Sequence, residues 1–279
     1  MRAALAEAFE LTDGPEGVEG ILSLLTTTVD AALLERAGPQ LRIVANYGAG
    51  VDNVDLAAAR ERGVLVANTP DVLTETTAEL AIALTLALLR RVAEGDRFVR
   101  RRNRWTFSLE FMLGESLRGK TFGVVGPGRI GRATARLAEA LGATPVFAGR
   151  GDDLEAMLRR ADVVSLHCPL TKETHHLIDR AALERMRPTA VLVNTARGQI
   201  VDERALVGAL REGVIAGAAL DVYEHEPEVS EELLALENVV LTPHIASATR
   251  ETREAMGLLA VSALRAVLVD GRTPPNVVS

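Results

Sequence analysis

Three residues have the types and spacing that reduction chemistry requires, and each follows a short apolar run: Arg197, Glu226 and His244. We expect those runs to be buried strands of a parallel sheet, whose carboxyl ends meet at one edge. Reduction of a ketone needs a cation that holds the substrate, an acid that protonates the oxygen, and a group that tunes this acid. Arg197, His244 and Glu226 fit these roles in that order, because a neighbouring carboxylate favours the imidazolium form of histidine.

Each of these residues alone has an ordinary structural explanation. Arg197 would be a surface group, Glu226 a turn residue before a proline, and His244 a hydrogen-bonding partner of the backbone. Three further histidines, His175, His176 and His225, are expected to be loop residues rather than ligands, and their spacing with His244 matches no metal-binding motif. We therefore predict no metal site. The catalytic interpretation depends on whether the same sheet edge binds a cofactor.

The stretch KTFGVVGPGRIG, residues 120–131, predicts such a cofactor site. Gly126, Gly128 and Gly131 follow an apolar run at the spacing G-x-G-x-x-G, and a segment of helical composition comes next. Gly126 permits a tight turn, Gly128 lets a pyrophosphate approach the backbone, and Gly131 allows close helix packing. The N–H groups at the helix start then face the phosphates. The motif alone is typical of any glycine-rich turn, but both flanks here favour dinucleotide binding.

The end of the second predicted strand bears on which dinucleotide binds. NAD sites normally place Asp or Glu there for the ribose 2′-hydroxyl, whereas this chain has Arg150. A guanidinium suits the 2′-phosphate of NADP by charge and by geometry. Alternatively, Arg150 stacks on the adenine of NAD, and Asp152 or Asp153 supplies the carboxylate. We favour NADP over NAD.

The elements that must position these residues are strands alternating with short helices, which implies an α/β fold with parallel sheets. A Rossmann-type doubly wound sheet is predicted from six strands at 121–125, 145–148, 163–166, 190–194, 216–220 and 239–241. A second, smaller domain is predicted from strands at 21–26, 41–45 and 64–67. The small substrate domain would comprise residues 1–73 and 249–279, and the dinucleotide-binding domain residues 74–248.

A long helical segment, predicted at roughly Thr74–Arg101, leads the chain from one domain to the next. The segment 103–119 that follows has no clear periodicity and carries several large apolar side chains: Trp105, Phe107, Phe111 and Met112. It either packs as a loop on its own domain or forms an arm on a partner subunit or over the active site. We favour the arm.

Composition excludes several classes of function. A chain with 48% hydrophobic and 25% charged residues is globular. Its net charge of −7 argues against nucleic acid as a partner, and we interpret the arginines of 97–104 as a solvated helix face or subunit contact. The single cysteine, Cys168, allows no disulfide framework. The longest apolar stretch is too short for a membrane and the start lacks a signal-peptide pattern, so we expect a cytoplasmic location without membrane association.

Seven segments, spread over nearly the whole chain, carry a family resemblance. They are NYGAGVDNVD, VANTPDVLTETTAELAIAL, GKTFGVVGPGRIGRA, VVSLHCPLTKETHHLI, NTARGQIVDERALVGAL, AGAALDVYEHEPE and LTPHIASAT. In this order they resemble the D-isomer-specific 2-hydroxyacid dehydrogenase family. The resemblance implies a flavodoxin-like small domain, reduction of a small 2-keto acid to the D-2-hydroxy acid with NAD(P)H, and a homodimer.

The resemblance also implies roles for individual residues. Arg197 in NTARG would bind the substrate and polarise its carbonyl, and Glu226 in EHEP would be the partner of the acid/base His244 in TPHIAS. The backbone N–H groups of Gly48, Ala49 and Gly50 would bind the substrate carboxylate. Asp221 would contact the nicotinamide carboxamide. The implied cofactor contacts, besides the glycines and Arg150, are Arg129, Ile130, Cys168, Pro169, Thr195, Ala196, Asp221 and Ser247.

Within the family, VLTETTAELA, the strand end AGR and PHIASATRETREAM look most like the glyoxylate/hydroxypyruvate reductase branch. D-3-Phosphoglycerate dehydrogenase is the close alternative. A dinucleotide-sensing binding protein of the corepressor type is an alternative of another class, because such relatives keep the same three catalytic residues.

The chain departs from the family pattern at its beginning. Members usually start with a strand that lies centrally in the small sheet, whereas this sequence opens on a helical pattern at Met1–Phe9. A start site assigned too late or a genuine compaction would explain the difference. The segment 151–160 is also too short for the extra strand usual after the second one, so we expect a helix alone there.

Overall fold

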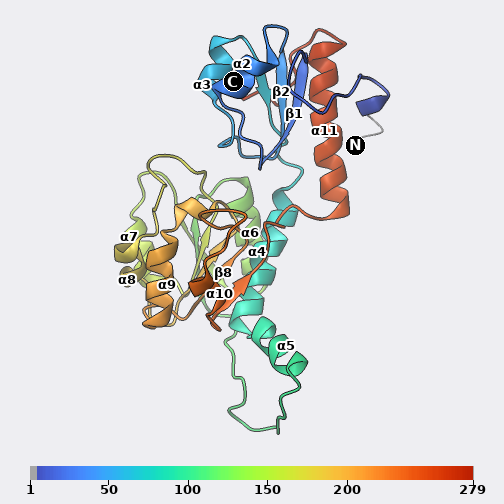
Figure 1. The fold of residues 1–279 in the computed structure, drawn as a ribbon. Coiled ribbons are helices and arrows are strands. Elements are labelled where there is room, and N and C mark those ends of the chain that lie inside the picture. The colour runs from blue at the N-terminus through green and yellow to red at the C-terminus, as the bar shows by residue number, and fades with distance from the viewer. Residues whose placement is uncertain (1–4, 279) are drawn as a thin grey trace. The chain divides into compact units, whose positions relative to one another are not determined.

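A computed structural model describes residues 5–278, which divide into two compact units. The first unit comprises the chain up to Thr74 together with Ser247–Ser279, and the second is Glu75–Ala246. Each has its own parallel sheet, of three strands in the first unit and six in the second (Figure 1). Ser247, expected within the dinucleotide-binding domain, falls in the first unit instead.

The second unit is built on six parallel strands in the order β5-β4-β6-β7-β8-β9. Their bounds are β4 (Thr121–Val125), β5 (Thr144–Ala148), β6 (Val163–Leu166), β7 (Val191–Asn194), β8 (Gly217–Leu220) and β9 (Val239–Leu241). The strand β4 has β5 on one side and β6 on the other, so successive strands are added first on one side of β4 and then on the other. This change of side is the switch point at which doubly wound sheets bind ligands, and the predicted Rossmann-type fold is confirmed. Among the described residues no strand lies beyond β5, as the short segment 151–160 predicted.

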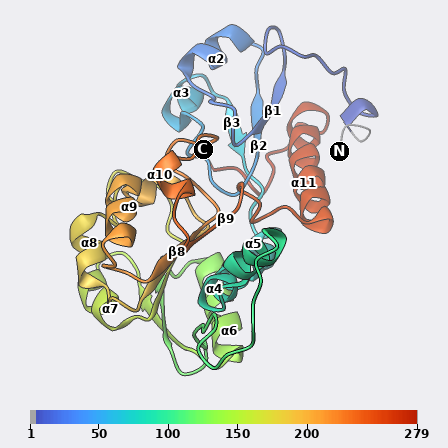
Figure 2. The same ribbon diagram turned by 60° about the horizontal axis from the view of Figure 1, so that its bottom comes forward.

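Helices cover both faces of this sheet (Figures 1 and 2). One face carries α7 (Leu154–Arg160), α8 (Arg180–Arg185) and α9 (Glu203–Arg211), and the other α4 (Thr74–Leu89) and α6 (Arg129–Ala140). The core is split accordingly: Leu192 of β7 packs in one cluster with Met157, and its neighbour Val193 packs in the other with Ile82. Consecutive strand residues face opposite sides, so both faces of β7 are apolar. The short helices η1 (Gly198–Ile200) and α10 (Glu231–Leu234) follow β7 and β8.

The first unit is a three-stranded parallel sheet between helices. The order is β1 (Gly20–Leu24), β2 (Ile43–Tyr47), β3 (Leu65–Ala67), and the helices are α2 (Ala31–Ala37), α3 (Leu56–Glu61) and α11 (Arg250–Leu268). Asp30, Asp55 and Thr249 accept N–H groups of the first turns of these helices, which explains where they begin. On one face Leu34 of α2 packs near Val44; α11 contacts β1 and β2.

No strand precedes β1 in the described residues, and β1 pairs directly with β2, with Gly20 opposite Ile43. Within residues 5–278, β2 therefore lies between β1 and β3. The helix predicted for residues 1–9 lies partly outside the described residues; within them Leu5 and Ala6 are helical. At the other end of the chain, the Val278 N–H donates to the Val66 carbonyl (2.8 Å), so the tail extends along β3.

The segment predicted to be helical at 74–101 is helical over most of its length, but it is not one continuous helix. It is broken into α4 and α5 (Val92–Arg100) at Arg91, which has a left-handed φ of 54°. We attribute the break to the arm at 103–119, which returns to the end of α4. There the Glu115 N–H donates a hydrogen bond to the Leu89 carbonyl at 2.8 Å. Arg91 is held there by two hydrogen bonds to Glu94, of 2.6 and 2.8 Å. No helix within residues 5–278 combines the length and hydropathy needed to cross a bilayer.

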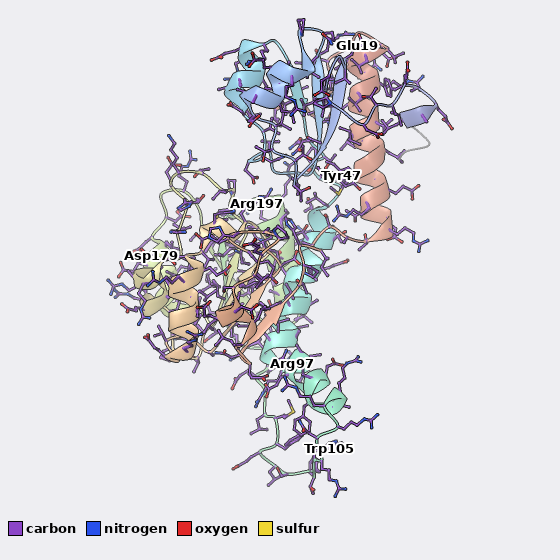
Figure 3. The ribbon with its side chains drawn as sticks, in the orientation of Figure 1. Glu19, Tyr47, Arg97, Trp105, Asp179 and Arg197 are labelled. Carbon is purple, nitrogen blue, oxygen red and sulfur yellow. The ribbon has the colours of Figure 1, made fainter. Side chains whose placement is uncertain are left out.

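The arm between α5 and β4 has no regular secondary structure. Leu117 near its end is buried, but several of its large apolar side chains, Trp105 among them, lie at the surface (Figure 3). Phe107 and Leu109 are 82% and 87% exposed. Trp105 stacks on Phe111 at a ring separation of 6.1 Å, and Phe111 in turn contacts Phe98 of α5 edge-on. These aromatic contacts tie part of the arm to α5 and leave the rest uncovered in a single chain.

Candidate active site

The ends of β8 and β9 bring Glu226 and His244 into contact. Nδ1 of His244 lies 2.7 Å from Oε2 of Glu226, so the ring N–H donates to the carboxylate. The other carboxylate oxygen, Oε1, accepts the Tyr223 N–H at 3.0 Å. Both side chains are about one-third exposed, at 32% and 31%. A histidine held in this way has its Nε2 for proton exchange with a ligand.

The carboxyl of Glu226 is ionised over a wide range of pH. Burial acts to raise its pKa, but the hydrogen bond and charge of His244 outweigh this effect and hold the pKa below its ordinary value of 4.5. The nearby charge of Arg197 contributes in the same direction. The electrostatic field of Arg197 therefore reaches the Glu226–His244 pair.

Asp221, at the end of β8, organises the loop that carries His244. Its side chain is fully buried. Oδ1 accepts the Thr242 hydroxyl (2.6 Å) and the Ile245 N–H (2.9 Å), and Oδ2 accepts the Ala246 N–H (2.8 Å). Its backbone carbonyl also accepts the His244 N–H at 2.8 Å. These contacts position His244, whereas the predicted contact of Asp221 with the nicotinamide carboxamide stays a prediction.

Tyr223 is a supporting residue that sequence reasoning missed. Its hydroxyl donates to the Thr242 carbonyl at 2.9 Å, and its N–H is the one that holds Glu226. Burial, together with nearby carboxylates, raises the pKa of Tyr223 to about 12, so the phenol remains a donor. Its position in the sequence between Asp221 and Glu226 is the feature that could have identified it.

Arg197 follows β7 in a turn shaped by the buried Asn194. The Asn194 amide donates to the Arg197 carbonyl (2.8 Å), and its oxygen accepts the Ala196 N–H (3.0 Å). Gly198 is required beyond the turn, because a Cβ there would lie 1.9 Å from the Tyr223 carbonyl carbon. Close packing of this turn on the Tyr223 loop explains how two separate strand ends keep a fixed spacing.

The glycine turn has the shape that a pyrophosphate requires. A Cβ at Gly126 would lie 2.5 Å from the Cys168 nitrogen, and one at Gly131 would lie 2.4 Å from the Gly126 carbonyl oxygen, so both glycines are needed for packing. A Cβ at Gly128 would meet open space. Among the side chains of residues 5–278, none caps the N-terminus of α6, which begins at Arg129. The exposed approach at Gly128 and the uncapped helix end therefore fit a dinucleotide phosphate.

The residues at the other strand ends are placed along the same edge of the sheet. Arg150 is exposed just after β5. Asp152 accepts the Gly149 N–H at 2.8 Å, and Asp153 accepts the Ala156 N–H at 2.9 Å as the cap of α7. Each of the two carboxylates that could have bound a ribose hydroxyl thus already accepts a backbone N–H.

Three further groups at this edge, those of Thr195, Cys168 and His167, are uncharged at neutral pH. The Thr195 hydroxyl has no hydrogen-bond partner within residues 5–278, which suits a polar group of a bound ligand. Burial raises the pKa of the Cys168 thiol to about 11. Burial also lowers the pKa of His167 to about 4, and the Ser165 hydroxyl lies 2.8 Å from its Nε2. In the described part of the chain no cluster of His, Cys, Asp and Glu could hold a metal ion.

The predicted carboxylate-binding residues belong to the first unit. Gly48, Ala49 and Gly50, which we call the 48–50 loop, directly follow β2. A side chain at Gly48 would displace Leu25, because its Cβ would lie 2.4 Å from the Leu25 side chain. The Gly48 N–H already donates to the Asn46 carbonyl at 2.9 Å. It is therefore engaged within the chain, whereas the sequence predicted that it would bind the substrate. Ser247 is half-buried just before α11.

The chain is similar to known proteins over most of its length. A family profile described as D-isomer specific 2-hydroxyacid dehydrogenase, NAD binding domain, matches residues 82–246. A glyoxylate reductase of Thermococcus litoralis is 46% identical, over 94% of this chain and 84% of its own. A crystal structure of a Thermus thermophilus protein has a TM-score of 0.90 at 49% identity, covering 95% of this chain and 87% of its own.

A second solved structure adds ligands to the comparison. The NADPH-dependent glyoxylate/hydroxypyruvate reductase of Sinorhizobium meliloti, in complex with NADP and malonate, is 39% identical with a TM-score of 0.85. The match covers 99% of this chain and 88% of that one. With a family profile over most of the second unit and close relatives over nearly the whole length, the chain belongs to the D-isomer specific 2-hydroxyacid dehydrogenases and is an NAD(P)-dependent oxidoreductase.

Proposed function

We propose that this chain reduces glyoxylate or hydroxypyruvate to the 2-hydroxy acid, in the D configuration where that carbon is chiral. The contact of His244 Nδ1 with Glu226 Oε2 carries the proposal, because it provides a held acid at the ligand-binding edge of a dinucleotide-type sheet. The relatives named glyoxylate reductase and glyoxylate/hydroxypyruvate reductase support this choice of substrate.

The proposed roles follow from the atoms that each residue presents. Bound NAD(P)H would supply the hydride to the keto carbon. His244 gives the proton on Nε2 to the keto oxygen, while Glu226 holds the ring through Nδ1 and balances the imidazolium charge. Arg197 holds the substrate and polarises the carbonyl, since a guanidinium offers several donors in a fixed plane.

The proposed labels of the two units follow from these roles. The second unit, which contains the matched NAD-binding region, is the dinucleotide-binding domain. The first unit is the substrate domain, and its 48–50 loop binds the substrate carboxylate through backbone N–H groups. The predicted cytoplasmic location stays a prediction.

Substrate assays test the function directly. Oxidation of NADPH and NADH should be followed with glyoxylate, hydroxypyruvate and 3-phosphohydroxypyruvate. The first two should give the highest kcat/KM. A clear preference for the third would identify a D-3-phosphoglycerate dehydrogenase instead. Absence of turnover with every keto acid, combined with dinucleotide-dependent binding of a protein partner, would favour the corepressor alternative.

NADP is the proposed cofactor. Arg150 is exposed where the 2′-phosphate is expected, and both neighbouring aspartates are engaged by backbone N–H groups. Arg150→Asp should lower kcat/KM for NADPH by about 10- to 100-fold, because hydrogen bonds between charged groups are lost, and should improve NADH. Arg211→Asp makes the same charge change in the last turn of α9 and is the control. Unchanged preference in Arg150→Asp would refute the assignment.

A homodimer is the proposed assembly. The large exposed apolar side chains of the arm, Trp105, Phe107 and Leu109, are 60%, 82% and 87% exposed in the single chain. Apolar patches of this kind mark protein contacts. Light scattering on the purified protein should give twice the chain mass of 29.8 kDa, and a mass of one chain would contradict the proposal.

A further inference from the structure

Two asparagine side chains donate hydrogen bonds to carbonyl groups of the 48–50 loop. Nδ2 of Asn46 donates to the Gly50 carbonyl at 2.8 Å, and Nδ2 of Asn68 donates to the Ala49 carbonyl at 2.7 Å. Asn46 is fully buried and Asn68 nearly so. The two carbonyls therefore point into the first unit, where each meets a donor.

This arrangement determines where the neighbouring N–H groups point. In a trans peptide unit the C=O and N–H groups point in opposite directions. The Ala49 carbonyl shares its peptide unit with the Gly50 N–H, and the Gly50 carbonyl shares its unit with the Val51 N–H. Holding both carbonyls inward turns these two N–H groups outward. Successive outward N–H groups form a concavity that binds anions.

The backbone extends this pattern by one residue. The Gly48 carbonyl accepts the Thr69 N–H at 2.9 Å, so the Ala49 N–H, in the same peptide unit, is also turned outward. Within residues 5–278 no acceptor is bonded to the N–H groups of Ala49, Gly50 or Val51. Three consecutive donors are thus presented together, and the set is shifted by one residue from Gly48–Gly50.

Each asparagine is itself held in place. The amide oxygen of Asn46 accepts the Ser23 hydroxyl at 2.8 Å and the Asn53 amide at 3.0 Å. The backbone of Asn68 is clamped by the C-terminal tail, because its N–H donates to the Asn276 carbonyl at 3.1 Å and its carbonyl accepts the Asn276 side-chain amide. The Asn46 amide can therefore not rotate away from the loop without breaking these bonds, whereas at Asn68 it is the backbone that the tail fixes.

We propose that Asn46 and Asn68 are positioning residues that orient the N–H groups of Ala49, Gly50 and Val51 to bind the carboxylate of the 2-keto acid. The inference rests on the proposed function, since it assigns the substrate's carboxylate to this loop. Neither asparagine touches the substrate in this account. Their effect passes through the peptide units whose carbonyls they hold.

Asn68→Leu tests the proposal, because leucine has nearly the shape of asparagine and removes both amide donors without leaving a cavity. The KM for the keto acid should rise about tenfold, as expected for loss of one hydrogen bond to a buried group, while kcat and the Kd for NADPH stay unchanged. The Kd for oxamate, a carboxylate analogue that is not reduced, should rise by the same factor in calorimetry. Asn68→Ala supplies a second variant should leucine prevent folding.

Asn238→Leu is the matched control. Its amide donates to the carbonyls of Leu210 and Ala216 in the second unit, at 3.4 and 3.3 Å, so the same kind of bond is lost elsewhere. It should leave KM and the oxamate Kd unchanged.

The outcomes separate this inference from the proposed function. Oxamate binding and KM unchanged in both Asn68 variants would overturn the positioning role, even if the enzyme reduces glyoxylate. Equal losses in kcat, KM and melting temperature would reduce it to a structural role and overturn it as well. Wild-type protein that binds oxamate without turnover would refute the function, yet weaker oxamate binding in Asn68→Leu would still support the inference. Absence of both oxamate binding and turnover in the wild type would overturn both.

Discussion

The His244–Glu226 pair and the 48–50 loop present different kinds of chemical group. The pair consists of two titratable side chains that are each about one-third exposed. The loop consists of backbone N–H groups, held by neutral amides that are almost fully buried. Proton transfer requires a group that changes charge, whereas binding a carboxylate requires donors that do not. The two regions should therefore respond differently to substitution and to pH.

The largest effect is expected from His244→Ala. Loss of the acid should lower kcat by about 10²- to 10⁴-fold, the usual contribution of a positioned acid or base. The Kd for NADPH should stay unchanged, because the phosphate turn lies on other strand ends. Fluorescence titration and steady-state kinetics measure the two quantities. His175→Ala removes an exposed loop histidine and is the control. Full activity in His244→Ala would show that His244 is not the acid, and the contrast with the 48–50 loop would no longer hold.

An intermediate effect is expected from Glu226→Gln. The pKa of Glu226 is held below 4.5 in the folded chain, so its ionised form stabilises the fold above about pH 4.5, and this contribution disappears as pH falls through the lowered pKa. The free energy of unfolding should decline less steeply below pH 4.5 in Glu226→Gln than in the wild type. Denaturant titrations at several pH values measure the slopes. Equal slopes would show that the ion pair does not contribute.

The last prediction concerns only the pH dependence of stability, at His167 in the same unit. Its pKa falls from 6.5 to about 4 on folding because of burial. Between pH 6.5 and 4 the unfolded chain therefore binds a proton at His167 that the folded chain does not bind. The free energy of unfolding should decrease as pH falls through this range. His167→Asn should remove this part of the pH dependence, whereas Asn68→Leu should shift stability by the same amount at every pH. Parallel curves for wild type and His167→Asn would refute the pKa shift.

Much of the second unit could be predicted from local pattern. The strands at 121–125, 163–166 and 239–241 have the predicted bounds, and the other three differ by one residue at one end. Each is an apolar run followed by a turn, and such runs are recognisable without knowing their neighbours. The glycine motif was readable for the same reason, since its requirements are those of one turn and one helix start.

The helix break at Arg91 could not be predicted in this way. Nothing in the local sequence prevents a helix from continuing, and the left-handed φ arises because the arm returns to take the Leu89 carbonyl. A distant N–H group competes here with the next turn of the helix. Propensity is a weak guide wherever such a tertiary contact decides.

The sequence by itself determined which chemical groups are available: a histidine, a glutamate and an arginine after strands, and a glycine-rich turn before a helix. Only the tertiary structure decided how those groups are held. Asp221 gathers the backbone of the His244 loop, and Asn276 reaches Asn68 across 208 positions. Residue types are local properties of a chain, whereas the orientation of a peptide unit depends on donors that folding brings from far away.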